Sequence, residues 1–448
     1  MACVIAAPSS GSGKTLLSLV ISAWARSRGL SLQAFKVGPD YLDPQLLTAA
    51  TGRPCRNLDL QLCGPNWVTK SFHGFGGSSD LALVEGVMGL FDGVGASEKG
   101  STAAVARQLG LPIVLVIDAS GQASSLAPLV KGFRDHDPKL TITGVVLNRV
   151  STPRHQQLLT EVLDSIGIKI LGCLPKDPQL QLKSRHLGLA PAHELDHLGT
   201  RINGWAAIAE SNLDIASLKY LLAAPSPAVD PINGLLGEIS SNASAKVYPV
   251  AIAQDNAFHF CYEETKDCLK ALGMPLIAWR PLEDEPLPLH AKGIILPGGF
   301  PEQYAAQLSQ CTRSLNELRA CYGKIPIYAE CGGMLLLGKS ITDLEGKVCP
   351  MAGLLPFHAQ KGKLQVGYRT IEGINNTLLI RNGDKLIGHE FHRWGLCNSN
   401  FNATKIKGHE IHKRFLTTKP PWKLKGWDLE QREEGWSTDL LHASWIHL

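Results

Sequence analysis

Long apolar runs and dense clusters of one charge are both missing from this sequence of 448 residues. No apolar stretch reaches the roughly 18 residues of a membrane-spanning helix, which argues against an integral membrane protein. Lys and Arg number 44 against 40 Asp and Glu, a formal net charge of +4, without a Lys/Arg-rich run or a basic stripe with aromatics. We therefore expect neither nucleic acid nor a membrane as a partner.

Paired cysteine motifs are absent as well. The eleven cysteines are odd in number and scattered, with no Cys-x-x-Cys pair. This pattern argues against a disulfide framework or structural zinc and favours the reducing cytoplasm. A secretory leader is not expected, because Met1–Ala7 lacks a cationic start and leads directly into a glycine-rich loop.

The first half alternates short apolar runs with helical stretches. One helix is expected over Thr15–Arg28, since Leu17, Ile21 and Trp24 share a face and Gly29 ends it. Strands separated by helices predict an α/β fold with a doubly wound parallel sheet covered on both faces. The expected strands are Cys3–Ala7, Leu32–Val37, Leu81–Glu85, Ile113–Ile117 and Ile142–Leu147.

Residues 216–246 differ in composition, with turn and linker residues such as Ala224-Pro-Ser-Pro and Ser240-Ser-Asn-Ala-Ser. The predicted organisation is a first domain over 1–215, a linker over 216–246 and a second α/β domain over 247–448. Strands of the second domain are expected at Val250–Ala253, Leu276–Ala278, Gly293–Leu296 and Ile325–Ala329.

A phosphate-binding loop follows the first expected strand. In the segment Gly11-Ser-Gly-Lys-Thr15, backbone N–H groups and a helix N-terminus favour an anion. We expect Gly11, Ser12, Gly13 and Lys14 to hold a nucleotide and the Thr15 hydroxyl to hold Mg²⁺. Pro8 stands where the strict pattern has glycine, and a glycine turn with a surface lysine is the alternative.

Further polar residues follow the next strands. Asp40 and Asp43 come after the second strand and Glu85 ends the third, so their carboxylates are expected at one sheet edge, as Mg²⁺ ligands. Lys36 is a candidate for stabilising a transferring phosphoryl group. Asn148 is a candidate for binding a purine base. The alternatives are that Asp40 and Asp43 serve in turns and that Asn148 caps a loop.

Cys331 stands between an apolar strand and a helix, in Pro326-Ile-Tyr-Ala-Glu-Cys-Gly-Gly-Met334. Such an elbow exposes a nucleophile at a helix N-terminus. The helix N-terminus favours the thiolate and stabilises an oxyanion. The alternative is a buried structural cysteine. Gly332 and the Gly298-Gly299 pair are candidate oxyanion donors. The spacing alone leaves four candidate bases, which are His389, His392, His442 and His447.

Together these segments resemble the cobyrinic acid a,c-diamide synthase family, glutamine-dependent amidotransferases that act on corrin carboxylates. The similarity extends in order over nearly the whole chain. Its segments are 6–15, 35–44, 84–93, 184–189, 297–302, 328–333, 388–392 and 443–447. Each motif alone is weak, but eight in order are specific, and the family tolerates the Pro8 variant of the loop.

The resemblance implies a dethiobiotin synthetase-like phosphate-loop domain followed by a class I glutamine amidotransferase-like domain. It implies Cys331 as the nucleophile and His447 as the base, with His389 and His392 structural or near the substrate. Thr15, Asp40 and Glu85 become the Mg²⁺ set. Residues assigned to substrate or metal are Asp43, Asp92, Arg185 and His186, with Arg185 and His186 expected to recognise corrin carboxylates.

The expected function is ATP- and glutamine-dependent amidation of the a and c carboxylates of cobyrinic acid, with ATP and Mg²⁺ and with L-glutamine as nitrogen donor. A homodimer is possible. The alternatives are amidation of hydrogenobyrinic acid or a nickel sirohydrochlorin and, from another class, a non-enzymatic phosphate-loop ATPase switch.

One departure from the wider glutaminase class concerns His447. That class orients its histidine with a Glu two residues later, whereas here Leu448 is the last residue of the sequence. The corrinoid branch resembles this dyad form, and the sequence leaves open which group orients the His447 ring.

Overall fold

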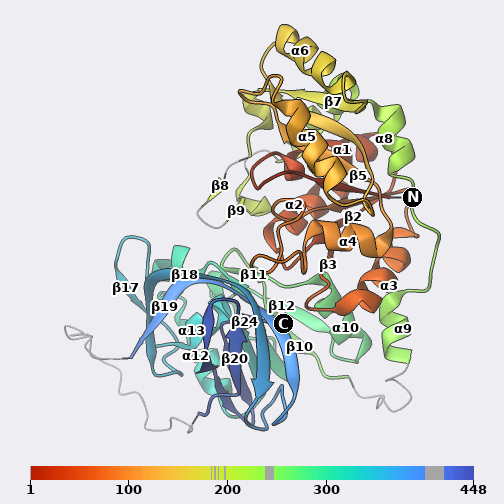
Figure 1. Cartoon of the computed structure of the whole chain (residues 1–448). Coiled ribbons are helices and arrows are strands. Elements are labelled where there is room, and N and C mark those ends of the chain that lie inside the picture. The colour runs from red at the N-terminus through yellow and green to blue at the C-terminus, as the bar shows by residue number, and fades with distance from the viewer. Residues whose placement is uncertain are drawn as a thin grey trace. The chain divides into compact units, whose positions relative to one another are not determined.

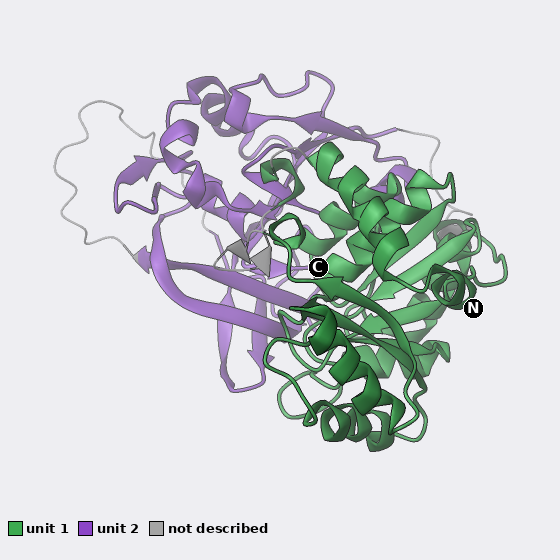
Figure 2. Cartoon of the chain, turned by 90° about the horizontal axis from the view of Figure 1, so that it is seen from above, with its two compact units in different colours: residues 1–237, 262–264 green, residues 238–261, 265–448 purple. Residues whose placement is uncertain are grey.

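The computed structural model describes residues 2–182, 184–185, 188–189, 191–195, 198–237, 247–398 and 418–448. The chain forms two compact units (Figure 2). Unit 1 comprises 1–237 and 262–264, and unit 2 comprises 238–261 and 265–448. Among the described residues, no helix combines the length and apolar character needed to cross a membrane.

Unit 1 is built on a seven-stranded parallel sheet with the order β3-β2-β4-β1-β5-β6-β7. The predicted strands and first helix are present within a few residues of their expected bounds. The strands are β1 (Cys3–Ala6), β2 (Leu32–Val37), β3 (Arg56–Leu58), β4 (Leu81–Glu85), β5 (Ile113–Asp118), β6 (Ile142–Val150) and β7 (Ile170–Pro175). The helices between them are α1 (Lys14–Ser27), α2 (Leu42–Thr51), α3 (Gly64–Gly76), α4 (Thr102–Leu109), α5 (Leu126–His136) and α6 (Pro153–Asp164).

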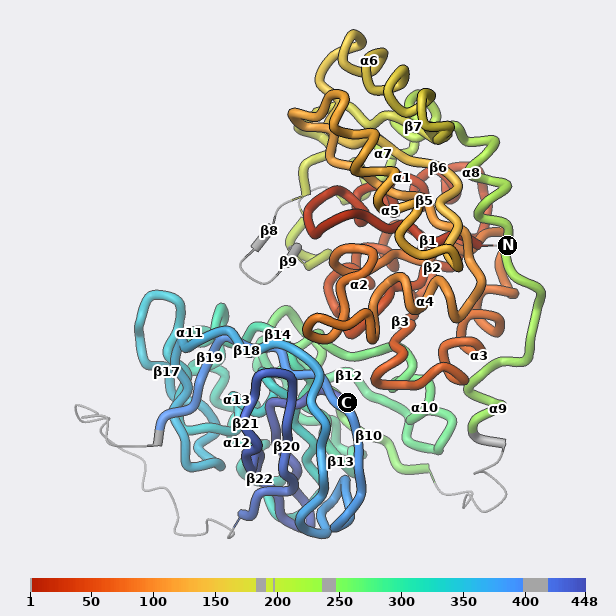
Figure 3. The backbone as a smooth tube through the Cα atoms, viewed as in Figure 1, coloured from red at the N-terminus to blue at the C-terminus, as the bar shows by residue number. Residues whose placement is uncertain are grey.

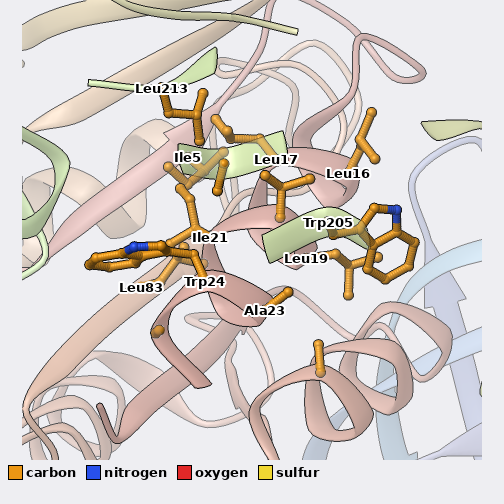
Figure 4. Packing of buried hydrophobic residues seen from close by; sticks show 14 of the residues in the cluster. Ile5, Leu16, Leu17, Leu19, Ile21, Ala23, Trp24, Leu83, Trp205 and Leu213 are labelled. Carbon is orange, nitrogen blue, oxygen red and sulfur yellow. The ribbon is translucent and has the colours of Figure 1, made fainter. Parts of the chain in front are cut away.

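Helices cover both faces of this sheet (Figure 1). Successive strand residues point to opposite faces, so Cys3 and Ile5 of β1 enter one core while Val4 and Ala6 enter the other. The first core surrounds α1, whose side chains pack against the sheet (Figure 4). Burial on both faces explains why these strands are continuous apolar runs.

The remainder of unit 1 differs from the predicted linker. Residues 216–237 contain helix α8 (Ile215–Leu221) and helix α9 (Pro231–Gly237), and Leu218 and Leu222 are buried in the first core. The predicted boundary at 215/216 thus falls inside unit 1, which continues to Gly237, whereas the predicted boundary at 246/247 falls inside unit 2. The other elements here are η1 (Pro178–Leu180), β8 (Ser184–Arg185), β9 (Gly188–Leu189), η2 (Ala192–Glu194) and α7 (Leu198–Asn212).

Unit 2 contains a six-stranded sheet with the order β12-β10-β13-β15-β23-β22, parallel except for the β22–β23 pair. Its strands are β10 (Val250–Ala253), β12 (Leu276–Trp279), β13 (Gly293–Leu296), β15 (Ile327–Glu330), β22 (Trp436–Thr438) and β23 (Leu441–Ser444). The helices are α10 (Glu263–Ala271), η4 (Pro281–Glu283), η5 (Pro301–Gln303), α11 (Ala305–Leu308), α12 (Thr312–Cys321) and α13 (Gly332–Leu337).

A second sheet of unit 2 was not predicted. Its longest strands, β18 (Phe357–Gly373) and β19 (Lys385–Asn398), run antiparallel side by side (Figure 3). The short strand β24 (Ile446–His447) pairs with β19 and places His447 opposite His389. The other strands are β16 (Ser340–Thr342), β17 (Val348–Pro350), β20 (Trp422–Gly426) and β21 (Leu429–Glu434), and β11 (Phe258–Phe260) pairs separately with β14 (Gly298–Gly299).

Candidate active sites

The loop between β1 and α1 surrounds the helix N-terminus. Gly13, the residue before α1, has a left-handed φ of 113°, and a Cβ there would lie 2.2 Å from Nδ2 of Asn148. Glycine is therefore required both by the backbone and by the space. The ammonium of Lys14 donates to the carbonyls of Met88 at 2.5 Å and Ser9 at 3.4 Å, so it already lies beside the loop.

A cavity of about 710 Å³ opens beside this loop, entirely within unit 1. It gathers predicted nucleotide and metal residues from the ends of β1, β2 and β6 at one edge of the sheet, as expected for ligand binding by a doubly wound fold. The predicted residues that line it are Gly11, Gly13, Lys14, Thr15, Lys36, Asp40, Asp43 and Asn148. Residues missed by the prediction also line it, among them Arg149, Lys176 and Asp177.

Carboxylates and one cation meet beneath the cavity. The Thr15 hydroxyl donates to Oε1 of Glu85 at 2.7 Å, and Nζ of Lys36 lies 2.9 Å from Oδ2 of Asp43 and 3.2 Å from Oε1 of Glu85. Lys36 is buried and also donates to the carbonyl of Gly86. The charge of Lys36 thus partly compensates the charges of Asp43 and Glu85, and its role at a transferring phosphoryl group stays a prediction.

Burial shifts the pKa values of these groups. It raises the pKa of Glu85 to about 7 and, with the charge of Asp43, that of Asp40 to about 6. Burial and the charge of Lys36 lower the pKa of Lys14 to about 8. Each of these pKa shifts favours the neutral form of the group, because the free protein does not supply enough opposite charge nearby. A triphosphate and a cation bound here would supply the missing countercharges.

The structure gives Asn148 and Asp92 contacts that the sequence did not predict. Asn148 donates from Nδ2 to the carbonyl of Ser12 at 2.9 Å, so it braces the phosphate loop. Asp92 accepts the N–H of Gly89 at 2.8 Å within its own loop and does not line the cavity. Arg185 belongs to β8, but its side chain, like the whole of His186, lies outside the described residues.

In unit 2, Cys331 forms the predicted elbow between β15 and α13. Its φ of 45° and ψ of −109° are strained for a residue with a Cβ, as in the nucleophile elbows of α/β-hydrolases. Its N–H donates to the carbonyl of Ser444 at 2.7 Å. Burial, and then the charge of Glu302, raises the pKa of the thiol well above its usual range. This shift disfavours the expected thiolate in the free protein, so attack by Cys331 calls for a base that takes the thiol proton.

The four candidate histidines are now distinguishable. Both nitrogens of His392 are engaged, with Glu390 and with the carbonyl of Trp394. Burial lowers the pKa of His442 to about 3, and burial with the charge of His447 does the same for His389. His447 instead lies near the elbow, because the N–H of Cys331 bonds to Ser444, three residues before it.

A carboxylate lies beside the His447 ring. Nδ1 of His447 lies 3.1 Å from Oε2 of Glu330, the residue before the nucleophile. Sequence reasoning missed Glu330, although a signal existed. It is an acidic residue that closes an apolar strand, the same position by which Glu85 was selected at the end of β4.

The three candidate oxyanion glycines lie together, with different surroundings. Gly332 directly follows Cys331 and begins α13, whereas the Cys331 thiol donates to the carbonyl of Phe391 at 3.6 Å. A Cβ on Gly332 would lie 3.0 Å from the N atom of Gly299. A Cβ on Gly298 would lie 2.4 Å from Cε1 of His447, so Gly298 provides room for the imidazole.

Two family domains are found in this chain by comparison with known proteins. Residues 3–189 match the family described as the CobQ/CobB/MinD/ParA nucleotide binding domain, and residues 249–448 match the CobB/CobQ-like glutamine amidotransferase domain. A protein of Synechococcus sp. named cobyrinate a,c-diamide synthase is 39% identical over 100% of this chain and 95% of its own length. One of the same name from Gloeobacter violaceus is 39% identical over 100% of this chain and 93% of its own.

This chain belongs to the cobyrinate a,c-diamide synthase family. Another relative, named hydrogenobyrinate a,c-diamide synthase, from Mycobacterium bovis, is 36% identical over 100% of this chain and 94% of its own length. Membership confirms the predicted resemblance, the α/β fold class and the enzyme class, a glutamine-dependent carbon–nitrogen ligase. The nucleotide-binding domain supports ATP use.

Proposed function

We propose that this protein uses ATP and glutamine to convert the a and c carboxylates of cobyrinic acid into amides. The observation that carries the proposal is the presence of two complete sites in one chain. Unit 1 has a phosphate-loop cavity lined by Lys14 and Thr15, and unit 2 has a strained cysteine with a carboxylate-bound histidine. The substrate follows from the names of relatives that match along the full chain.

In unit 1, the proposed chemistry is activation of a carboxylate. Ammonia does not displace oxide from a carboxylate, so the γ-phosphoryl of ATP is transferred first, which gives a mixed anhydride with phosphate as leaving group. Lys14 holds the phosphates and Asn148 fixes the loop around them. Here catalysis consists mainly of positioning and charge neutralisation.

We assign Mg²⁺ to the Thr15 hydroxyl with Glu85 and Asp40, and Asp43 as a further acidic neighbour. The fit is supported by Oε2 of Glu85, which is buried without a hydrogen-bond partner among the described residues. Within those residues no group of three His, Cys, Asp or Glu side chains forms a metal site by itself. The hydroxyl and phosphate oxygens would complete the ligands, and bound Mg²⁺ would neutralise phosphate charge.

In unit 2, the Cys331 sulfur attacks the side-chain amide carbon of glutamine. His447 takes the thiol proton and returns it to the nitrogen as ammonia leaves, and water then cleaves the glutamyl thioester. The N–H groups of Gly332 and Gly299 are assigned to the oxyanion. Two such cycles supply the two amides.

The test is incubation with cobyrinic acid, ATP, Mg²⁺ and glutamine, with mass spectrometry of the product. We expect two carboxylates to become amides, each lowering the mass by about one unit (OH replaced by NH₂). Cys331→Ala should abolish the glutamine-driven reaction and retain the ammonium-driven one, whereas Cys349→Ala should retain both. Glutamine-driven amidation by Cys331→Ala would contradict the cysteine mechanism.

A second candidate substrate is hydrogenobyrinic acid, because the relative from Mycobacterium bovis carries that name. The same assay with both acids separates them by their relative kcat/KM. A non-enzymatic switch is not retained, since the chain belongs to a ligase family. A cytoplasmic location, a homodimer and corrin recognition by Arg185 and His186 stay predictions.

A further inference from the structure

Glu330 ends β15 and directly precedes the nucleophile. We propose that Glu330 is the positioning residue of the glutaminase, fixing the His447 ring from the strand that carries Cys331. The inference rests on the proposed roles of Cys331 and His447. In the wider glutaminase class, a Glu two residues after the histidine orients the imidazole. The inference gives this orienting role to Glu330, the residue before Cys331.

The carboxylate of Glu330 is itself held firmly. Its Oε1 accepts the Tyr328 hydroxyl at 2.5 Å and the backbone N–H of Leu448 at 3.2 Å, while Oε2 lies 3.1 Å from Nδ1 of His447. Burial and the charge of Glu330 raise the pKa of the Tyr328 hydroxyl, which therefore remains a donor. A side chain fixed at both oxygens has little rotational freedom left to lose when it orients a partner.

The contact with Glu330 determines which imidazole nitrogen acts. A carboxylate accepts hydrogen bonds, so Nδ1 of His447 carries the proton and Nε2 retains the lone pair needed to deprotonate a thiol. Cε1 of the ring occupies the space left by the missing side chain of Gly298. A flipped ring would replace the Nδ1–H···O bond by a C–H group facing the carboxylate, so one orientation is favoured.

The same contact compensates charge during the reaction. When His447 takes the proton of Cys331, the ring becomes a buried cation, which is costly without an adjacent anion. Two other buried carboxylates of unit 2, those of Glu390 and Glu434, are engaged by partners of their own. Glu390 lies between Arg369 and His392, and Glu434 accepts hydrogen bonds from Trp422 Nε1, Ser444 Oγ and the N–H of Trp445.

The experiment compares Glu330→Gln, Glu330→Asp and Tyr328→Phe, with Glu434→Gln as the matched control. Glu434 is a buried carboxylate of the same unit, and it accepts hydrogen bonds from Trp422, Ser444 and Trp445. Glu330→Gln should lower kcat for glutamine hydrolysis roughly 10²–10³-fold with KM changed less than about threefold. Glu330→Asp should restore part of kcat, and Tyr328→Phe should lower it roughly 3–10-fold.

Glu434→Gln should lower the melting temperature but keep kcat within about threefold of the parent. All variants should retain ammonium-driven amidation, which reports an intact fold. A kcat for Glu330→Gln within about threefold of the parent overturns the inference, as does an equal loss in Glu434→Gln. Failure of the proposed cysteine mechanism would be recognised by a different result, because the Cys331→Ala variant would then still hydrolyse glutamine.

Discussion

At the scale of single residues, Cys331 is the proposed nucleophile, and its surroundings favour the neutral thiol. Burial raises its thiol pKa most and the charge of Glu302 next, and burial raises the pKa of Glu302 itself to about 7. The Glu302 side chain thus becomes negatively charged as the pH rises through about 7. Its charge then opposes formation of the Cys331 thiolate.

We expect Glu302→Gln to accelerate alkylation of Cys331, because the variant removes a negative charge that opposes the thiolate. The rate of iodoacetamide labelling, followed by mass spectrometry of the Cys331 peptide, should rise several-fold at pH 8–9. The difference from the parent should shrink below about pH 7, where Glu302 is protonated. Glu434→Gln should leave the rate unchanged, and an unchanged or slower rate in Glu302→Gln would contradict the electrostatic account.

Lys14 predicts a pH dependence of nucleotide binding. Burial and the charge of Lys36 lower its pKa to about 8 in the free protein, and bound phosphates favour the ammonium form. Nucleotide affinity should therefore be constant below about pH 8 and fall about tenfold per pH unit above it. Titration calorimetry from pH 6.5 to 9.5 measures this. Lys14→Arg, charged throughout, is the control, and an equal decline in that variant would implicate another group.

Most residues of the two candidate sites could be selected from the sequence, because polar side chains that follow or end apolar strands gather at one edge of a parallel sheet. Lys14, Thr15 and Glu85 follow or end apolar strands, and the structure brings them together. Their partners were not predictable. That Lys36 neutralises Asp43, or that Glu330 meets His447 across 117 positions, depends on long-range packing that no spacing encodes.

At the scale of elements, strands buried on both faces were predictable and half-exposed strands were not. The predicted bounds of β4, β10 and β13 agree with the structure because every residue there is apolar or closes the run, and those of β2 agree although Gln33 and Lys36 interrupt its apolar residues. The hairpin β18–β19 mixes exposed charged residues with buried ones, so its sequence has no clean period of two. Its register depends on pairing across the chain.

The elbow itself depends on close contact between α13 and β13. A Cβ on Gly333 would lie 2.0 Å from the carbonyl oxygen of Leu296, a backbone atom that has little room to move. Gly333→Ala should destabilise unit 2 by about 1–3 kcal/mol and reduce glutaminase activity by displacing Cys331. Thermal unfolding measures the first effect. Gly395→Ala, where a Cβ would meet nothing within 4 Å, should be nearly neutral, and equal stability of both variants would contradict the packing argument.

At the scale of the whole molecule, each unit contains the elements that its own site needs. The phosphate loop, the carboxylates and their cavity belong to unit 1, and Cys331, Glu330 and His447 belong to unit 2. Each has its own apolar core and sheet. Loss of one chemistry therefore need not remove the other.

We accordingly expect Lys14→Ala to abolish ATP-dependent amidation and to retain glutamine hydrolysis within about tenfold of the parent. The substitution removes a phosphate contact in unit 1 and changes no residue of unit 2. Ammonia release and amide formation, measured in parallel, separate the two activities. Lys70→Ala, on an exposed position of α3, should retain both. If Lys14→Ala folds but loses all ammonia release, the glutaminase requires an occupied nucleotide site, and the independence of the two units is wrong.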